Sequence, residues 1–390
     1  MKYWRISLSV AALAIVCLVG CKPADGGGSA AGGSSGDVIK VGEFASLNGS
    51  EAAFGRSAHN GTELAIDDIN AAGGVMGKKL KLITEDNQSK DGESATAVKK
   101  LISLDKVVAI LGEVASGRSL EAAPVCQNAK IPQVSPSSTN PKVTQVGDYI
   151  FRVCWEDHFQ GSTVLAKFAL NSMKVKKVAM LTDVGAPYSV GLAGFFREGF
   201  AVGGGQIIAE QKYTKDDKDF KAQLTAIKGF NPEAIFIPGY YSQVTLIALQ
   251  ARELGFTVPI FGGDGWEAPE LIQGPGAAEA LEGCYFSTHF SPDQEGSKAK
   301  EFVAKYEKKY KARPDAMGAL GYDSVLVLVD AIKRAGTTDG PKLRDALATT
   351  KDIDGVTGKT TLDADRNARK PAVIIQIKGG KFVYKETVNP

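Results

Sequence analysis

Cysteine and histidine are scarce in this sequence, with 5 cysteines and 3 histidines among 390 residues. So few cysteines exclude a small disulfide-stapled scaffold, and the near-average 44% hydrophobic and 23% charged residues exclude global disorder. His59, His158 and His289 are isolated along the chain, and neither an HExxH nor a CxxC motif occurs. We therefore expect no metal site, no redox site and no cofactor.

An excess of charge of one sign is also missing. The chain has 46 basic and 44 acidic residues, and residues 1–20 contain Lys2 and Arg5 but no acid, so the remainder is formally neutral. Proteins that bind duplex nucleic acid usually carry a basic excess that replaces condensed counterions. Nucleic acid is therefore not an expected partner.

Long hydrophobic runs are absent except near the N-terminus, where residues 6–19 are apolar. As a helix this run would be about 21 Å long, shorter than the roughly 30 Å hydrocarbon core, so residues 1–20 are typical of a signal peptide. Residues 18–21, Leu-Val-Gly-Cys, resemble a bacterial lipobox, which implies that Cys21 is lipidated. The alternative is an ordinary secretory signal followed by a chance cysteine.

A linker follows the signal peptide over residues 21–37, and its residues 24–36 are only glycine, serine, alanine and aspartate. This composition cannot build a core and is typical of a flexible tether. We expect an exported lipoprotein in the periplasm or at the cell surface, anchored to a membrane by acyl chains without spanning it. Lys22 after the lipidated cysteine favours the outer membrane if the cell has two membranes.

Apolar strands alternate with helical patterns from residue 38 onward. Strand patterns occur at residues 38–44, 80–83, 107–111 and 131–134, and a second series occurs at 177–181, 206–208, 234–237 and 259–261. Continuous apolar strands separated by helices are typical of parallel sheets covered on both faces. The sequence therefore predicts an α/β fold with two doubly wound parallel-sheet lobes. In such sheets ligands bind beyond the carboxyl ends of the strands.

The loops after these strands are rich in glycine, hydroxyl and aromatic residues and poor in pairs of nucleophile and base. No GxGxxG follows a strand, no GxSxG forms a nucleophile elbow between a strand and a helix, and the Gly77-Lys78 pair lacks the rest of a phosphate-binding loop. This composition is typical of a recognition site. We expect no enzyme, although residues distant in sequence can still assemble a triad in space.

Four motifs resemble a known family: Asn-Ala-Ala-Gly-Gly-Val at 70–75, Ser-Pro-Ser-Ser-Thr-Asn-Pro at 135–141, Gly-Tyr-Tyr at 239–241 and Gly-Asp-Gly at 263–265. With these motifs in order, the chain from residue 38 onward resembles the branched-chain amino acid (Leu/Ile/Val) substrate-binding proteins of ABC transporters. The resemblance implies a periplasmic-binding-protein type 1, or Venus-flytrap, fold with a three-segment hinge near residues 156–157, 289 and 363–364. The implied lobes are residues 38–156 with 289–363, and residues 157–288 with 364–390.

The same resemblance implies a ligand pocket between the lobes. In the first lobe, Ser116 and Thr139 match residues that hold the ligand carboxylate, beside a helix expected to start at Ser119. Thr139 also matches the residue that contacts the ligand ammonium, Ser138 would offer a backbone carbonyl, and Phe54 would form an aromatic wall near the ligand side chain. A purely structural role is the alternative, because serine and threonine often cap helices.

In the second lobe, Tyr188 and Tyr240 match aromatic residues that close over the ligand, or they are packing residues. Asp264 stands where the family often has a glutamate as counter-ion to the ligand ammonium, and Arg118 adds a cation near the carboxylate end. The implied mechanism is stabilisation of the closed state, because the second-lobe contacts form only on closure. The expected ligand is leucine, isoleucine or valine, with an amide or an aromatic acid as alternatives.

These implications give a function hypothesis: a monomeric receptor that delivers a small amino acid to an ABC permease in the inner membrane. A ligand sensor of the same fold and an extracytoplasmic enzyme are the alternatives.

Three cysteines remain after the lipidation site. Cys126 and Cys154 could form a disulfide, and the alternative is that both, like Cys284, are buried thiols that behave as small hydrophobic residues.

Overall fold

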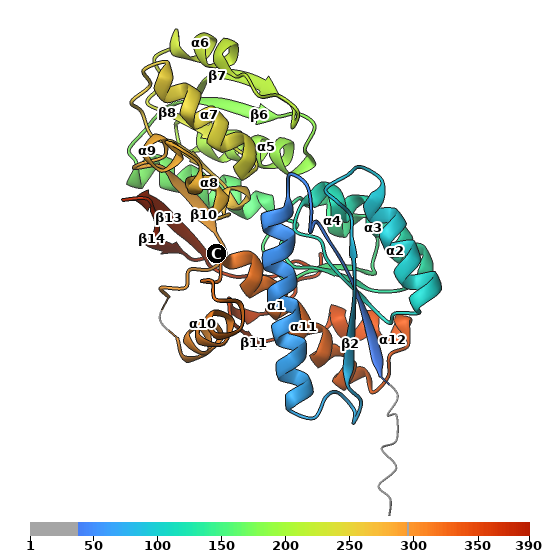
Figure 1. Cartoon of the computed structure of the whole chain (residues 1–390). Coiled ribbons are helices and arrows are strands. Elements are labelled where there is room, and N and C mark those ends of the chain that lie inside the picture. The colour runs from blue at the N-terminus through green and yellow to red at the C-terminus, as the bar shows by residue number, and fades with distance from the viewer. Residues whose placement is uncertain (1–37, 295) are drawn as a thin grey trace, which may run out of the picture. The chain divides into compact units, whose positions relative to one another are not determined.

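The computed structural model describes residues 38–294 and 296–390, which belong to one compact unit, residues 37–390 (Figure 1). The predicted signal peptide, the lipidation site Cys21 and the linker lie outside the described residues. Among the described residues, no helix is long and apolar enough to cross a membrane.

The first sheet has five parallel strands in the part of the chain that the structure describes, in the order β2-β1-β3-β4-β5. Its strands are β1 (Ile39–Ala45), β2 (Leu80–Asp86), β3 (Ile110–Leu111), β4 (Gln133–Ser135) and β5 (Ile150–Arg152). The intervening helices are α1 (Ala52–Ala71), α2 (Glu93–Lys100), a π-helical turn (Leu101–Asp105), α3 (Ser116–Ala129) and α4 (Lys142–Gln145).

The second sheet has seven described strands in the order β14-β13-β10-β9-β8-β6-β7. Five of them are parallel: β6 (Lys177–Asp183), β7 (Gln206–Tyr213), β8 (Ala234–Ile237), β9 (Ile260–Gly262) and β10 (Tyr285–Thr288). The helical segments around them are two π-helical segments (Phe159–Leu165 and Phe168–Ser172), α5 (Pro187–Val202), α6 (Lys221–Lys228), α7 (Tyr241–Glu253), a 3₁₀ turn η4 (Asp264–Trp266), α8 (Glu270–Gln273) and α9 (Ala277–Ala280).

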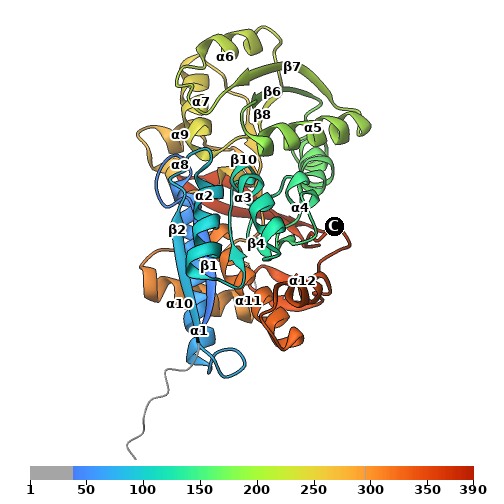
Figure 2. The same ribbon diagram turned by 90° about the vertical axis from the view of Figure 1, so that its right-hand side faces the viewer.

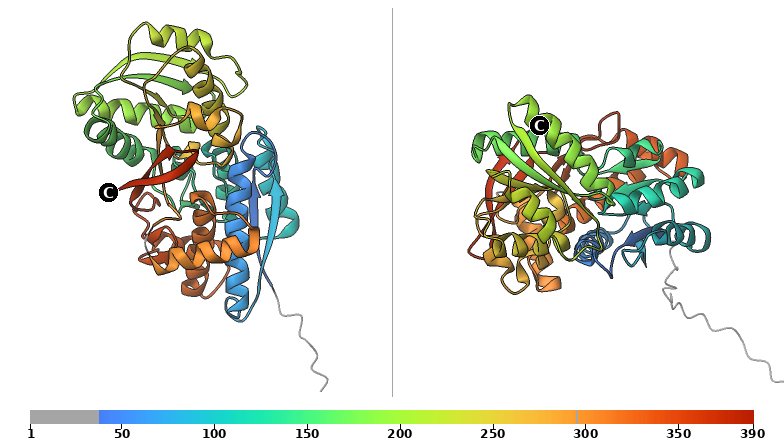
Figure 3. Two further views of the ribbon diagram at one scale, coloured as in Figure 1. Left: turned by 60° about the vertical axis from the view of Figure 1, so that its left-hand side comes forward. Right: turned by 90° about the horizontal axis from the view of Figure 1, so that it is seen from above.

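After β10 the chain returns to the first sheet and then comes back to the second. The returning part contains α10 (Ser297–Tyr310), α11 (Ala316–Ala335), α12 (Gly340–Ala348) and the strand pair β11 (Ile353–Gly355) and β12 (Gly358–Thr360). Residues of α11 and α12 share a hydrophobic cluster with β1 and β3. Figure 2 shows α11 and α12 in the same lobe as β1 and β2. The C-terminal strands β13 (Ala372–Lys378) and β14 (Lys381–Val388) then add an antiparallel pair to β10, drawn in dark red in Figure 3.

The predicted fold class is confirmed: each lobe is an α/β unit built on a largely parallel sheet. Both sheets place their first strand between the second and the third, which creates a switch in strand order where ligands bind in open α/β sheets. Three details differ from the expectation. Strand β3 is shorter than residues 107–111, the terminal pair β13–β14 is antiparallel, and α3 begins at Ser116 rather than Ser119.

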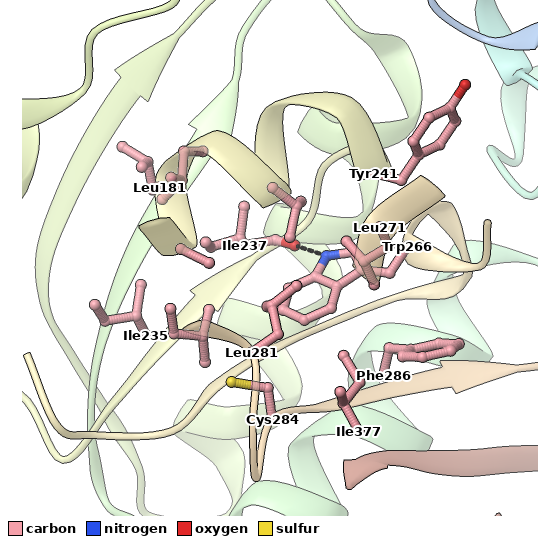
Figure 4. Packing of buried hydrophobic residues seen from close by; sticks show 14 of the residues in the cluster. Leu181, Ile235, Ile237, Tyr241, Trp266, Leu271, Leu281, Cys284, Phe286 and Ile377 are labelled. Carbon is pink, nitrogen blue, oxygen red and sulfur yellow. Dashed lines mark hydrogen bonds between the residues drawn. The ribbon is translucent and has the colours of Figure 1, made fainter. Parts of the chain in front are cut away.

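Two packing features position the cleft residues. Helices α1 and α11 approach so closely at Gly61 that a Cβ there would lie 1.8 Å from the carbonyl oxygen of Gly318, so glycine is required. In the second lobe Trp266 is fully buried, and its indole N–H donates to the carbonyl of Ile237 at 2.9 Å (Figure 4). This anchor fixes η4 and with it the side chain of Asp264.

Candidate functional site

Residues from both lobes surround a small buried pocket at the carboxyl ends of the strands. Its cavity measures about 10 Å³, roughly the space of one water molecule. Five of the seven predicted ligand-binding residues line it, whereas Ser138 and Thr139 do not. The lining residues are Phe54, Val114, Ser116, Ser137, Tyr188, Tyr240, Asp264, Gly265 and Met317.

Ser116 is the first residue of α3, whereas the sequence predicted that this helix would start at Ser119. Its hydroxyl accepts a hydrogen bond from the backbone N–H of Asn140 at 3.2 Å. The buried Glu113 organises the preceding loop, because its carboxylate accepts from the N–H groups of Ser46 at 2.7 Å and Ala115 at 2.8 Å. Burial and the nearby Glu51 raise the pKa of Glu113 to about 7. The helix N-terminus favours an anion at this end of the pocket.

Ser138 supports the loop between strand β4 and helix α4 rather than the cavity. Its hydroxyl hydrogen-bonds with the carbonyl of Glu113 at 2.9 Å and with the hydroxyl of Ser119 at 2.8 Å. Its carbonyl, which was expected to face the ligand, accepts from the buried guanidinium of Arg152 at 2.6 Å, so one of its lone pairs is already used. The neighbouring Thr139 differs, because its buried hydroxyl has no hydrogen-bond partner among the described residues.

Tyr188 and Tyr240 stack with ring centroids 5.2 Å apart and an interplanar angle of 8°. Phe54 meets the edge of Tyr240 at 5.6 Å, so an aromatic wall joins α1 of the first lobe to the second lobe. Burial raises the pKa values of both tyrosines well above the ordinary value, and both phenols are therefore neutral near pH 7. These contacts show that the residues pack together as well as line the cavity.

Asp264 is the most heavily hydrogen-bonded acid of the pocket. Its Oδ1 accepts from the amide of Gln160 at 2.8 Å and from the hydroxyl of Tyr188 at 3.0 Å. Its Oδ2 lies 3.2 Å from Nε2 of His289. Three donors from three separate segments therefore fix the carboxylate in one orientation at the cavity wall.

A second buried acid, Asp157, lies close to this pocket and was not predicted as a site residue. Burial, with a smaller contribution from Asp264, raises its pKa well above the ordinary value. The nearby Thr139 hydroxyl partly offsets that rise, although no hydrogen bond of standard geometry reaches the carboxylate. Burial therefore favours the neutral form of Asp157, which avoids the cost of a second buried negative charge.

Arg118 does not supply the extra cation expected at the carboxylate end. Its guanidinium pairs with Glu51 at 3.0 Å, Asp91 at 2.9 Å and Glu121 at 3.2 Å, so its charge is compensated inside the first lobe. Asp91 also pairs with Lys215 of the second lobe at 3.0 Å. This charged cluster lines a separate cavity of about 440 Å³ between the lobes.

The structure does not contain the possible disulfide between Cys126 and Cys154. Cys126 and Cys154 are both free, fully buried thiols, and they belong to different hydrophobic clusters. Cys284 is also free and buried. The alternative interpretation, buried thiols that pack as small hydrophobic residues, describes the structure.

Sequence reasoning did not find the residues that orient Asp264. Gln160 lies in no motif, and His289 was expected only near a hinge crossover, because their contacts with Asp264 span 104 and 25 residues of sequence. Ser137 and Met317 also line the cavity, and only the position of Ser137 inside the 135–141 motif could have indicated it. Among residues 38–294 and 296–390, no group of three or more metal-ligating side chains occurs.

Comparison with known proteins gives consistent matches over nearly the whole described chain. Residues 38–381 match the family model for periplasmic binding proteins. The Leu/Ile/Val-binding protein homolog 3 of Brucella melitensis biotype 1 is 30% identical over 353 residues, which are 89% of this chain and 94% of that protein.

Solved structures agree with this comparison. A leucine binding protein, LivK, from Thermotoga maritima is 41% identical with a TM-score of 0.86, over 90% of this chain and 99% of that chain. The branched-chain amino acid transporter substrate binding protein LivJ from Streptococcus pneumoniae, in complex with isoleucine, is 38% identical with a TM-score of 0.86, over 91% and 100%. A benzoate complex of a solute binding protein from R. palustris, at 21% identity, shares the fold.

Proposed function

Because the chain belongs to the periplasmic binding protein family, we propose that it is a receptor that captures a branched-chain amino acid between its lobes. The observation that carries the proposal is the oriented Asp264 carboxylate, which shares one pocket with Ser116 at the start of α3. An amino acid zwitterion has one negative and one positive group, and the pocket offers a complementary group for each. Members of this family bind solutes and are not enzymes.

The ligand carboxylate is expected at the first-lobe end of the pocket. There the N-terminus of α3 and the hydroxyl of Ser116 favour an anion, and the unpartnered hydroxyl of Thr139 is available once the lobes move apart. The ligand ammonium is expected at Asp264, and an aliphatic side chain would pack against Phe54, Val114 and Met317. The small cavity requires that the lobes separate to admit a leucine-sized molecule.

Closure of the lobes then distinguishes the receptor with bound ligand from the empty receptor. A ligand shifts an equilibrium only by the difference in its affinity for the two states. Tyr188, Tyr240 and Asp264 all belong to the second lobe, so their contacts supply that difference when the ligand already rests on the first lobe. The closed form would be recognised by an ABC permease in the inner membrane.

The same proposal includes the anchor and the location of the protein. Lipidation at Cys21 and the linker of residues 21–37 would hold a monomeric receptor at a membrane surface while it stays outside the cytoplasm. The names of similar proteins, which describe binding of leucine, isoleucine and valine, support an amino acid as the ligand.

A thermal-shift screen of residues 37–390, refolded to remove bound ligand, tests the proposal against amino acids, amides and aromatic acids. A ligand at one hundred times its Kd adds about 2.7 kcal/mol to the free energy of unfolding. Leucine, isoleucine or valine should raise the Tm, and Asp264→Asn should abolish the shift, whereas the exposed control Glu307→Gln should retain it. A shift only with aromatic acids would refute the ammonium site, and no shift at all would favour a sensor with another ligand.

A further inference from the structure

Two of the chain segments that connect the lobes meet in a buried aromatic stack. Trp155 follows β5 in the first crossover, and His289 follows β10 in the second. Their ring centroids lie 3.7 Å apart with an interplanar angle of 25°, and both side chains are buried. A change in the relative position of the two crossovers must therefore move the imidazole of His289.

The same imidazole reaches into the pocket. Its Nε2 lies 3.2 Å from Oδ2 of Asp264 and 3.4 Å from the hydroxyl of Ser137, which also lines the cavity. Because a carboxylate oxygen accepts hydrogen bonds, a proton on Nε2 would let the ring donate to Asp264. The other ring nitrogen, Nδ1, is buried and has no hydrogen-bond partner among the described residues.

We propose that His289 is a positioning residue that links the hinge to the ammonium site and selects ligands that carry an amine. The inference rests on the proposed function, since it assigns the ammonium to Asp264. With a neutral imidazole, Asp264 keeps its negative charge for the ligand while its orientation follows the position of the crossovers. With an imidazolium, the carboxylate would already have a cationic partner and would attract the ammonium less.

The surroundings of His289 favour the neutral ring. Burial lowers its pKa, the buried Lys370 lowers it further, and Asp264 opposes both effects. Asp264 also lies near the buried acids Asp157 and Glu267, and burial raises the pKa values of both and favours their neutral forms. Burial likewise raises the pKa values of Tyr188, whose hydroxyl donates to Asp264, and of Cys154. Trp155 covers one face of the ring and carries no charge. Acidification should therefore protonate His289 only below the ordinary histidine range.

Two substitutions separate the roles of the ring and of the donor. His289→Phe keeps an aromatic ring for Trp155 and removes the hydrogen bond to Asp264, whereas His289→Gln offers an N–H donor that cannot titrate. Calorimetry of the full chain with L-leucine and with 4-methylpentanoate, which lacks the amine, should be done between pH 5 and pH 8. His158→Gln is the control, because the side chain of His158 is 63% exposed.

His289→Phe should weaken L-leucine about 10- to 100-fold, as expected for the loss of a hydrogen bond to a charged group, and change 4-methylpentanoate less than threefold. His289→Gln should lose less affinity for L-leucine than His289→Phe does. Its affinity should also fall less at low pH than that of the wild type, because glutamine cannot be protonated. Nitrogen NMR can identify the imidazole signal of His289, because the chain has 3 histidines and that signal is lost in His289→Gln. In the wild-type chain this signal should be that of a neutral ring protonated at Nε2.

Equal weakening of both ligands by His289→Phe would show that the residue only supports the fold, and unchanged affinities would also overturn the inference. An Nε2 without a proton in the NMR experiment would overturn it independently of any ligand. If the wild-type chain binds 4-methylpentanoate but not L-leucine, the proposed function itself fails. If L-leucine binds and only the His289 variants behave unexpectedly, the proposed function stands and this inference is wrong.

Discussion

At the scale of single residues, the pocket depends on hydrogen-bond partners that are far apart in sequence. A family resemblance could predict Ser116, Tyr188 and Asp264 because each lies shortly after the end of a strand. It could not predict that Ser138 bonds inside its own lobe, because that depends on a guanidinium from β5, Arg152. The sequence therefore predicts which residues lie at the site. How many lone pairs of each group remain free for a ligand can be known only from the folded structure.

Tyr188→Phe tests the orientation of Asp264. The substitution keeps the ring that stacks on Tyr240 but removes the hydroxyl that donates to Asp264 and accepts from the N–H of Gly265 at 3.1 Å. We expect roughly tenfold weaker L-leucine binding by calorimetry and a loss of about 1 kcal/mol in the free energy of unfolding. The control Tyr384→Phe changes a 41% exposed residue and should alter neither. Unchanged binding would mean that the phenol hydroxyl does not contribute to the ligand site.

The thiols give a second test at this scale. Burial raises the pKa of Cys154 to about 12 and raises the pKa values of Cys126 and Cys284 as well, so little thiolate forms at neutral pH. Iodoacetamide should leave residues 37–390 unmodified while folded. After denaturation without a reductant, mass spectrometry should find three adducts. A single adduct under those conditions would indicate a disulfide between two of the cysteines.

At the scale of elements, the alternation of strands and helices was predictable because fully buried parallel strands are continuously apolar. The antiparallel pair β13–β14 was not, since its exposed outer strand lacks that signal. The N-terminus of α11 shows another limit. Asp315 caps this helix by accepting from the N–H of Gly318 at 3.0 Å, and Glu267 of the second lobe accepts from the N–H of Ala316 at 3.0 Å. Only the fold brings these two acids to one helix end.

Glu267→Gln should change how stability depends on pH. Burial and the neighbouring Asp315 raise the pKa of Glu267 well above its ordinary value of 4.5. The folded state therefore binds this proton more tightly than the unfolded state, and the free energy of unfolding falls as the pH rises above about 4.5. Glutamine resembles the protonated acid, so the variant should lose less stability than the wild type between pH 5 and pH 8 in urea denaturation. A steeper loss in the variant would show that the charged form is the stabilising one.

At the scale of the whole folded unit, direct contacts between the lobes accompany the pocket. The amide of Asn140 donates to the carbonyl of Pro187 at 2.7 Å, and the hydroxyl of Tyr241 accepts from the N–H of Ala53 at 3.3 Å. The pair of Asp91 and Lys215 adds a charged contact at the edge of the neighbouring cavity. The two-lobed fold was predictable from two series of apolar strands, but these contacts were not, because they join loops and helix ends rather than strands.

Lys215→Gln measures how much the charged contact favours closure. Both side chains are well exposed, at 43% for Lys215 and 75% for Asp91, so the pair should contribute at most about 1 kcal/mol. Closure forms this contact together with the ligand contacts, so losing it should weaken L-leucine binding up to about fivefold at low ionic strength. The difference should disappear in 1 M NaCl, where the screening length falls to about 3 Å.

The matched control for this test is Lys221→Gln, because Lys221 pairs with Glu253 at 3.0 Å within the second lobe. Its removal changes the net charge by the same amount but breaks no contact between the lobes, so binding should stay unchanged at either salt concentration. If both variants weakened L-leucine equally, the effect would come from the overall charge of the protein. If Lys215→Gln alone weakened it equally at low and high salt, lost packing of the lysine stem would be the cause, and the ion pair would not drive closure.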